Sequence, residues 1–366
     1  MTTTSMRPID RFLAAFRHEE TDRVPIFECM ANAKLFPHYI GKENMYSDGV
    51  PHVELARRLG LDSALVHTGG YTSLILREHD WKSDTEFVDE FGVPHQVSPA
   101  SWPLAMAVGH SMPTREDWEK APRPDPMAEW RYKNIREAIK EAHRGKDDDM
   151  ALIAGVRGAF TVMFISMGFD NMALTVYDDP DLLREMSAYF TDFWTKIAVR
   201  AVEMGADAIF IANDMGFNTN TLLAPDTMRD IFLPDLKKQV KAIQDAGAKV
   251  ILHTCGCVNP ILPDLVDTGI DALNDLQRAA GMDIAQIKKD YGDRLTLIGN
   301  VDATNVLTTK NPEEIDEAVK EVLRVAGHGG GLIMASDHSL HGAIPYENVD
   351  RFLAAAREYG RYPLQV

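Results

Sequence analysis

The chain has 366 residues, and its 38 basic and 55 acidic side chains give a formal net charge of 38 − 55 = −17. Hydrophobic residues make up 45% and charged residues 25% of the sequence, a composition typical of globular proteins that excludes a disordered or fibrous one. The acidic balance also argues against nucleic acid as a partner, because binding to phosphates needs a basic face.

The three cysteines, Cys29, Cys255 and Cys257, are too few for a disulfide framework. The first residues contain a short apolar patch that charged side chains interrupt, which is unlike a signal peptide. No stretch approaches the roughly 20 apolar residues of a membrane span. We therefore expect a reduced, cytoplasmic protein that does not enter a membrane.

Short apolar runs alternate with helical stretches along the whole chain. Continuous apolar strands between helices are typical of a parallel sheet that is covered on both faces. Eight such runs occur, at 23–27, 62–67, 151–156, 206–212, 249–253, 271–274, 294–299 and 331–335. Eight strand–helix units predict an α/β fold of the closed (β/α)₈ TIM-barrel type. A single run can equally be part of a buried helix, so the prediction depends on the count.

The helices between these runs have recognisable ends. The stretch at 179–205 begins with an Asp–Pro pair, which is typical of a helix start. The stretch at 225–247 has helical spacing as well, and Pro234 should kink or split it. The stretch at 311–327 begins with Asn and has acidic residues in its first turn, which suits the helix dipole.

The segment 68–150, between the second and third runs, is rich in proline and is longer than an ordinary β/α connection. We interpret it as an insertion that covers one mouth of the barrel and contains a helix near 127–144. No second compact domain is evident, so we expect one domain over residues 1–366.

In a TIM barrel the catalytic residues lie at the C-terminal ends of the strands. Polar residues follow the predicted strands here, and many of them are able to bind a metal. In chain order they are Glu28, Cys29, His67, Arg157, Asn213, Asp214, His253, Cys255, Cys257, Asn274, Asp275, Gln277, Asn300, Asp302, Ser336, Asp337 and His338. Strand ends also turn polar simply because they enter loops, so position alone assigns no role to any one residue.

The sharpest motif in this set is His253-x-Cys255, at the end of the fifth run. Imidazole and thiolate are ligands of Zn²⁺, and alternation along an extended chain points both side chains to the same side. A third ligand must come from elsewhere in the ring of strand ends, and we favour His338. The alternatives for this third position are Glu28, Asp337 and Cys257. The other interpretation of the motif is a buried histidine beside small core thiols.

Other strand-end residues have candidate roles around such a metal. Asp214 can act as a general base, bind a ligand hydroxyl or merely cap the next helix. His67 and Arg157 can orient an anionic substrate, although residues of these types more often pack or form ion pairs. We also expect contacts to substrate from the amides of Asn213, Asn274 and Gln277.

Five segments of the chain carry a resemblance to a known family, at 11–27, 247–277, 293–307, 329–340 and 344–363. In these segments the chain resembles the uroporphyrinogen decarboxylase superfamily and, within it, the cobalamin-dependent methyltransferase branch. This resemblance implies the same barrel. It also implies that His253 and Cys255 bind zinc, as the corresponding pair does in the methyltransferases.

Two departures from the family patterns narrow the expected substrate. The decarboxylase proper holds an anionic tetrapyrrole with arginines near the first strand, whereas this chain has no arginine between Arg23 and Arg57 and has Glu28 there. In thiol-methylating members a late cysteine completes the zinc site, but no cysteine follows Cys257. The resemblance therefore favours an oxygen- or nitrogen-bound methyl group, as in a methoxylated aromatic compound or a methylated amine.

These observations predict transfer of a methyl group from a small substrate to the cobalt of a corrinoid. Zn²⁺ would act as a Lewis acid on the leaving atom, and Asp214, Glu28 or His338 would supply or position the proton. The sequence has no D-x-H-x-x-G corrinoid-binding signature, so we expect a separate corrinoid protein or free cobalamin as partner. The alternatives are a decarboxylase of a small or tetrapyrrole carboxylic acid and a non-catalytic ligand-binding barrel. The sequence is also compatible with a homodimer.

Overall fold

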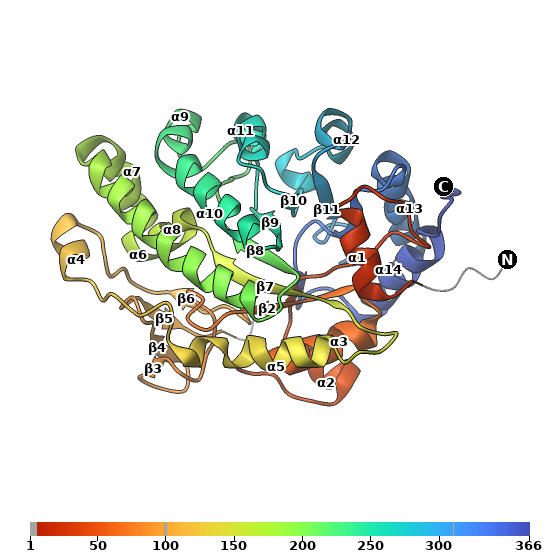
Figure 1. The fold of residues 1–366 in the computed structure, drawn as a ribbon, viewed down its shortest axis with the longest axis horizontal. Coiled ribbons are helices and arrows are strands. Elements are labelled where there is room, and N and C mark those ends of the chain that lie inside the picture. Colours follow the sequence, from red (N-terminus) through yellow and green to blue (C-terminus); the bar gives the residue numbers. More distant parts are fainter. Residues whose placement is uncertain (1–5, 99–100, 310) are drawn as a thin grey trace.

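The computed structural model describes residues 6–98, 101–309 and 311–366, and its centre is a curled parallel sheet of seven strands in the order β12-β11-β10-β9-β8-β7-β2 (Figure 1). The strands are β2 (Ser63–His67), β7 (Ala151–Arg157), β8 (Ala208–Ala212), β9 (Lys249–His253), β10 (Ala272–Asn274), β11 (Thr296–Val301) and β12 (Leu332–Ser336). Seven of the eight predicted strands are thereby confirmed. Their parallel pairing brings all their C-terminal ends to one edge of the sheet.

The first predicted strand, 23–27, is not a regular strand. It forms one parallel bridge, between Ile26 and Met334 of β12. The N–H of Phe27 donates to the carbonyl of Met334 (3.0 Å), and the N–H of Asp62, just before β2, donates to the carbonyl of Ile26 (2.9 Å). Pro25 has no N–H and cannot contribute a full ladder. The structure thus shows a curled α/β sheet, and eightfold closure by regular strand pairing is not confirmed.

Helices lie around the outside of this sheet (Figure 1). They are α1 (Pro8–Ala15), α2 (Leu35–Ile40), α3 (Gly49–Leu59), α4 (Arg115–Lys120), α5 (Lys133–Ala142), α6 (Ala159–Met167), α7 (Phe169–Asp178), α8 (Pro180–Glu203), α9 (Pro225–Thr227), α10 (Leu233–Asp245), α11 (Leu262–Asp267), α12 (Ile284–Tyr291), α13 (Pro312–Val322) and α14 (Tyr346–Tyr359).

The predicted helix ends agree with local hydrogen bonding. Asp179 caps α8 by accepting a hydrogen bond from the N–H of Leu182, and Asn311 caps α13 in the same manner. The stretch predicted to break at Pro234 does so. A five-residue π-helical turn separates α9 from α10, and α10 begins one residue before the proline. Proline at the first turn of a helix leaves no hydrogen bond unmade.

The connection between β2 and β7 contains a four-stranded antiparallel sheet that the sequence did not predict. Its strands are β3 (Asp80–Trp81), β4 (Glu86–Val88), β5 (Pro94–Gln96) and β6 (Met106–Ala107), in the order β3-β4-β5-β6. The connection ends in α5, which contacts α3, β2 and β7 and is the helix expected near 127–144. A further short parallel pair joins β1 (Met30–Ala31) to β13 (Leu340–His341).

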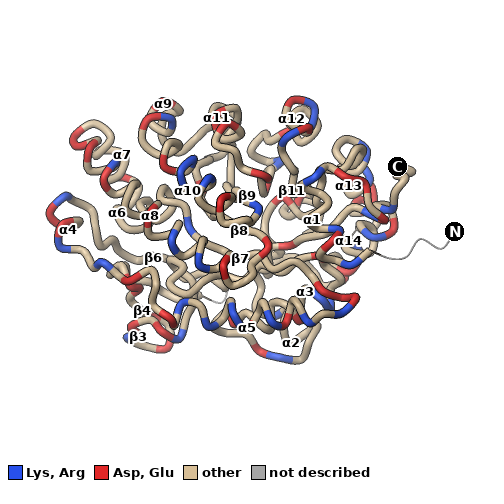
Figure 2. The backbone as a smooth tube through the Cα atoms, viewed as in Figure 1, with Lys and Arg blue, Asp and Glu red and all other residues tan. Residues whose placement is uncertain are grey.

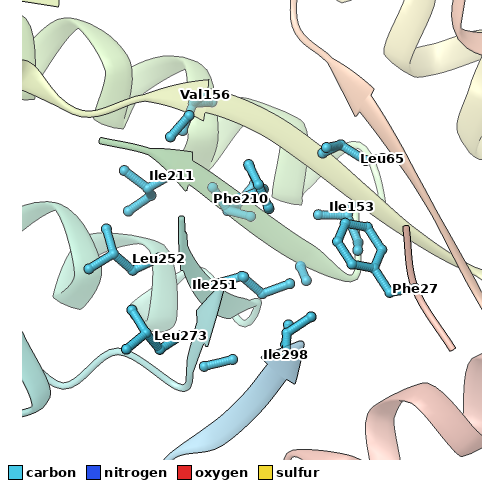
Figure 3. Packing of buried hydrophobic residues seen from close by; sticks show 14 of the residues in the cluster. Phe27, Leu65, Ile153, Val156, Phe210, Ile211, Ile251, Leu252, Leu273 and Ile298 are labelled. Carbon is cyan, nitrogen blue, oxygen red and sulfur yellow. The ribbon is translucent and has the colours of Figure 1, made fainter. Parts of the chain in front are cut away.

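The interior of the curled sheet is filled with apolar side chains. Phe27, Ile153, Phe210 and Ile251 are fully or almost fully buried and lie together on its inner side (Figure 3). The rings of Phe27 and Phe210 are 6.3 Å apart. Because the middle of the sheet is packed in this way, the space enclosed by the strands opens up beyond their C-terminal ends.

The charged residues lie mainly on the periphery. Acidic and basic side chains are interspersed along the outer helices (Figure 2). Among the described residues, no single helix is both long enough and apolar enough to cross a membrane. The bent pair of α6 and α7, at 104°, meets that test only when the two are taken together.

Candidate active site

A cavity of about 380 Å³ lies at the C-terminal ends of the strands. Its size falls within the range of small-molecule sites. Seven of the predicted site residues line it, namely Glu28, His67, Arg157, Asp214, His253, Cys255 and His338. Residues 101–104 of the long β2–β7 connection also contribute to the wall.

Strand register places two of these residues at one level of the cavity. Arg157 of β7 is paired with Ala212 of β8, and Ala212 is paired with His253 of β9. Paired residues in a parallel sheet point to the same face, and all three line the cavity. Neighbouring strands are roughly 4.8 Å apart, so the backbones of Arg157 and His253 are separated by about 10 Å.

Asp214, His253 and Cys255 line the cavity, and Asp275 contacts both His253 and Cys255; we call these four residues the acidic wall. Nε2 of His253 lies 3.5 Å from Oδ1 of Asp214 and 3.6 Å from Sγ of Cys255. Sγ of Cys255 lies 3.7 Å from Oδ2 of Asp275. The ligand atoms of Asp214, His253 and Cys255 all lie within 4.8 Å of one another.

His253 is oriented by the amide of Asn274. Nδ1 of His253 donates to Oδ1 of Asn274 at 2.8 Å, which leaves Nε2 free to face Cys255. Burial alone would lower the pKa of His253, but the charges of Asp275 and Cys255 outweigh it and hold that pKa well above its ordinary value. The negative charge of the wall therefore favours a cation here, either a second proton on His253 or a metal ion.

Cys255 also belongs to a second set of possible metal ligands. The ligand atoms of Cys255, Asp275 and His338 also lie within 4.8 Å of one another, whereas His253 and His338 share no group. Burial, with the nearby charge of Asp214, raises the pKa of Cys255 to about 12. A thiol in this setting ionises when a metal takes the place of its proton.

Glu28 is buried at the edge of the cavity and is linked to the last strand. Its Oε1 accepts the N–H of Ser336 at 2.6 Å, and its Oε2 lies 2.8 Å from Oγ of Ser336. That hydroxyl also contacts the carbonyl of His338, and one hydroxyl proton cannot serve two acceptors. Burial raises the pKa of Glu28 to about 8, so a protonated Glu28 that donates to Ser336 resolves the conflict.

Another part of the cavity lining consists of His67, Tyr71 and Arg157, which we call the arginine wall. The Arg157 guanidinium stacks on the Tyr71 ring, with 3.9 Å between its carbon and the ring centroid. His67 lies against the other residues of this wall, and its ring is 4.2 Å from that of Tyr71. Burial and the charge of Arg157 lower the pKa of His67 well below its ordinary value, so His67 is neutral.

Five predicted site residues do not line the cavity, namely Asn213, Asn274, Gln277, Asp337 and Cys257. The amide of Asn213 accepts from the N–H of Thr161, that of Asn274 holds His253, and that of Gln277 accepts from the N–H of Gly256. The carboxylate of Asp337 accepts from the N–H groups of Arg278 and Ala303. Cys257 is buried and belongs to neither metal-ligand group. Of these five, Asn274 bonds His253 of the acidic wall and Gln277 bonds the residue after Cys255.

Sequence reasoning gave no role to Asp275 or Tyr71. Asp275 directly follows β10, so its strand-end position was visible, but its contact with Cys255 depends on how β9 and β10 pair. Tyr71 lies beyond β2 in a turn with no recognisable motif. Only its stacking against Arg157 reveals it as part of the site.

The donor atoms of the acidic wall fit a zinc ion. Zn²⁺ binds imidazole nitrogen, thiolate and carboxylate oxygen, and Asp214, His253 and Cys255 offer one of each. The bond from His253 to Asn274 is the kind of outer contact that fixes a histidine ligand.

Residues 105–359 match the family described as Uroporphyrinogen decarboxylase (URO-D). The chain belongs to the uroporphyrinogen decarboxylase family. This confirms the resemblance found in the sequence.

Relatives of the chain include enzymes of two kinds. Methylcobamide:CoM methyltransferase MtaA from Methanosarcina barkeri is 30% identical over 225 residues, which cover 62% of this chain and 63% of that protein. The match thus spans less than two thirds of MtaA. Uroporphyrinogen decarboxylase from Chlorobaculum parvum is 24% identical over 336 residues, 87% of this chain and 88% of the relative. Family membership alone does not choose between methyl transfer and decarboxylation.

A solved structure supports the fold. The methyltransferase from Methanosarcina mazei superimposes with a TM-score of 0.77 at 24% sequence identity. The match covers 97% of this chain and 99% of that one. The α/β architecture, curled sheet included, is therefore that of a known family structure.

Proposed function

We propose that the protein is a corrinoid-dependent methyltransferase that takes a methyl group from a small oxygen- or nitrogen-methylated donor. The observation that carries the proposal is the convergence of Asp214, His253 and Cys255 on one point of the cavity wall. The similarity to Methylcobamide:CoM methyltransferase MtaA supports the same reaction class. In this proposal the acceptor is cobalt in a corrinoid that a partner protein or free cobalamin provides.

Asp214, His253 and Cys255 would hold Zn²⁺, since they form the group that contains both residues of the sequence motif. When bound, Zn²⁺ supplies a Lewis acid that weakens the bond between the methyl carbon and the leaving atom. Asn274 fixes the ring of His253 for this purpose. Asp214 is thus assigned to the metal rather than to proton transfer.

His338 is assigned to the leaving atom. When the methyl carbon departs, the donor oxygen or nitrogen keeps the bonding electron pair, and an ether oxygen then takes up a proton. The electron pair of the new bond to the methyl carbon would come from the corrinoid acceptor in its cob(I)alamin state. His338 lines the cavity and groups with Cys255 and Asp275 beside the zinc ligands, so it can deliver that proton. Glu28, protonated and bonded to Ser336, holds the chain that carries His338.

A decarboxylase of a tetrapyrrole has less support. Among the described residues, Arg157 is the one Arg or Lys side chain that lines the cavity. A substrate with many carboxylates would also meet the acidic wall. The small cavity and its single fixed cation fit a smaller donor.

We extend the proposal to the fold. Residues 25–27 are bonded to β12 on one side and to the residue before β2 on the other, so we propose that they complete a (β/α)₈ barrel. In this view, 68–150 is an insertion within a single domain, and part of it covers the cavity.

A direct assay tests the reaction. Protein purified without chelator is incubated with cob(I)alamin and a panel of methoxylated aromatics and methylated amines, and loss of the cob(I)alamin absorbance is followed. We expect about one zinc per chain and zinc-dependent turnover of at least one donor. Removal of zinc should abolish that turnover, and its return should restore it. Protein that binds no zinc, or that turns over equally well without it, would contradict the proposal.

A further inference from the structure

Arg157 is buried and carries a charge that no carboxylate balances. Its side chain is 3% exposed, and Nη2 donates to the carbonyl of Thr72 at 2.8 Å. Nε is buried without a partner. Within the described chain, no Asp or Glu lies within ion-pair distance of this guanidinium, although a buried charge is normally paired because of its desolvation cost.

The other buried arginines show that this is an exception. Arg11 is bound by the carboxylates of Asp22 and Asp62, and Arg131 is bound by Glu90. Both lie away from the cavity. The chain therefore supplies a carboxylate to each buried arginine except the one that faces the cavity, where a ligand can supply it.

The guanidinium is also held in place before any ligand binds. The Tyr71 ring covers one of its faces, and the carbonyl of Thr72 anchors one of its nitrogens. A planar guanidinium fixed in this way binds carboxylates with two parallel hydrogen bonds. His67, which lies against Tyr71, is neutral and adds no competing charge.

The register of the strands sets the distance between this cation and the proposed metal. Arg157 and His253 are at one level, with Ala212 between them and about 10 Å between their backbones. With a cavity volume of about 380 Å³, this separation limits the donor to a small molecule on the scale of a single ring. Apolar side chains, among them Leu65, Phe210 and Trp102, also line this cavity.

We infer that Arg157 binds a carboxylate of the methyl donor, which makes the donor a single-ring methoxylated aromatic acid. The inference rests on the proposed function for the identity of the methyl group, but the carboxylate site stands on the geometry of Arg157. A methylated amine is the less suitable donor, because its positive charge would be repelled by Arg157.

Binding measurements without corrinoid test the inference. Isothermal titration calorimetry compares 3- and 4-methoxybenzoate with the neutral 3- and 4-methoxybenzamide. We expect at least one benzoate to bind about tenfold or more tightly than its amide, a difference of about 1.4 kcal/mol. Arg157→Gln should reduce this preference to within about twofold, and Arg157→Lys should retain part of it, since the charge remains but the two-bond geometry is lost.

Arg361→Gln is the matched control, because it removes the same charge from an exposed position outside the cavity and should leave the preference unchanged. Thermal melts of all variants check folding, and if Arg157→Gln does not fold, Arg157→Lys and the wild-type preference carry the test. Equal affinity for benzoates and benzamides, binding of neither, or an unchanged preference in Arg157→Gln would overturn the inference.

The two proposals fail separately. A clear preference for benzoates in a protein that transfers no methyl group would reject the proposed function and leave the carboxylate site in place. Methyl transfer from amides or amines as fast as from the acids, with Arg157→Gln as active as wild type, would reject the carboxylate site and leave the proposed function.

Discussion

The acidic wall and the arginine wall border one cavity but balance charge in different ways. On the acidic wall, each ionisable group lies within 4 Å of another, as His253 lies 3.5 Å from both Asp214 and Asp275. On the arginine wall, the single cation has an aromatic ring and a carbonyl for neighbours, but no carboxylate. The first wall gathers ligands around one point, and the second is complete only when an anion binds.

This difference predicts different effects of substitution. Groups on the acidic wall are coupled, since Asp214 accepts the N–H of Cys255 as well as facing His253. A change there should alter metal binding and activity together. A change on the arginine wall should alter the choice of ligand and leave the metal in place.

Cys255→Ser should have the largest effect. Changes to residues that merely support a metal ligand cost 10- to 100-fold in affinity, so loss of a direct ligand should lower zinc affinity by at least about 100-fold. Chelator competition and the zinc content per chain measure this, with activity lost in parallel. The control is Cys257→Ser, the same substitution two residues further on and outside both ligand groups. Full zinc occupancy in Cys255→Ser would show that this thiol is not a ligand.

Glu28→Gln tests whether Glu28, which lies outside the acidic wall, is protonated and therefore uncharged in the folded protein. Burial raises the pKa of Glu28 from 4.5 to about 8, so between these values the folded protein holds a proton that the unfolded chain has released. The contribution of Glu28 to stability is therefore full below about pH 4.5 and is lost as pH rises toward 8, at about 1.4 kcal/mol per pH unit. Gln mimics the protonated acid, accepting from the Ser336 N–H and donating to its Oγ.

Denaturant unfolding of wild type and Glu28→Gln from pH 5 to pH 9 measures this contribution. The variant should match wild type in weakly acidic buffer and become progressively more stable than wild type as pH rises. Parallel stability curves across the whole range would mean that Glu28 is ionised in the fold.

Asn274→Ala should weaken the acidic wall without removing a ligand. His253 loses the acceptor at 2.8 Å that fixes its ring, so zinc affinity should fall by about 10- to 100-fold. Zinc titration monitored with a chromophoric chelator gives the value. Asn259→Ala, an exposed amide in the loop after β9, should leave the affinity unchanged. If both variants bind zinc as tightly as wild type, Asn274 does not position His253 as a zinc ligand.

His338→Ala should have the smallest effect of the four, a fall in turnover of at least about tenfold, or about 1.4 kcal/mol in the barrier. Zinc content should stay near one per chain, because Asp214 rather than His338 is assigned to the metal. His341→Ala, which alters another cavity-lining histidine outside both ligand groups, is the control. Loss of zinc from His338→Ala would make His338 the third ligand instead.

The sequence predicted those parts of the fold that depend on local patterns. The run at 249–253 coincides with β9, and it was predicted as a strand because it is one of eight such runs that alternate with helical stretches. The antiparallel sheet β3–β6 was missed, because strands of two or three residues leave no periodicity to detect. The run at 23–27 differs from a full strand because it contains Pro25.

In the candidate site, too, the contacts between residues close together in the sequence were predictable and the contacts between distant residues were not. Alternation along one strand was enough to bring His253 and Cys255 together, since they are two residues apart. The contact between Cys255 and Asp275 and the stacking of Arg157 on Tyr71 join residues far apart in the sequence. Pairing of different strands determines those contacts, and one sequence does not specify that register.

Ala212 separates the two walls and decides how much space remains between them. Its methyl side chain is paired on one side with Arg157 and on the other with His253, and it lines the cavity. Any larger side chain at this position would project into the gap that a ring needs. If the inference about Arg157 holds, Ala212 therefore helps to set the size of the ligand that fits without binding it. Larger side chains at position 212 should therefore exclude ring-shaped ligands and admit only narrow, chain-like ones, while Arg157 and the acidic wall remain unchanged.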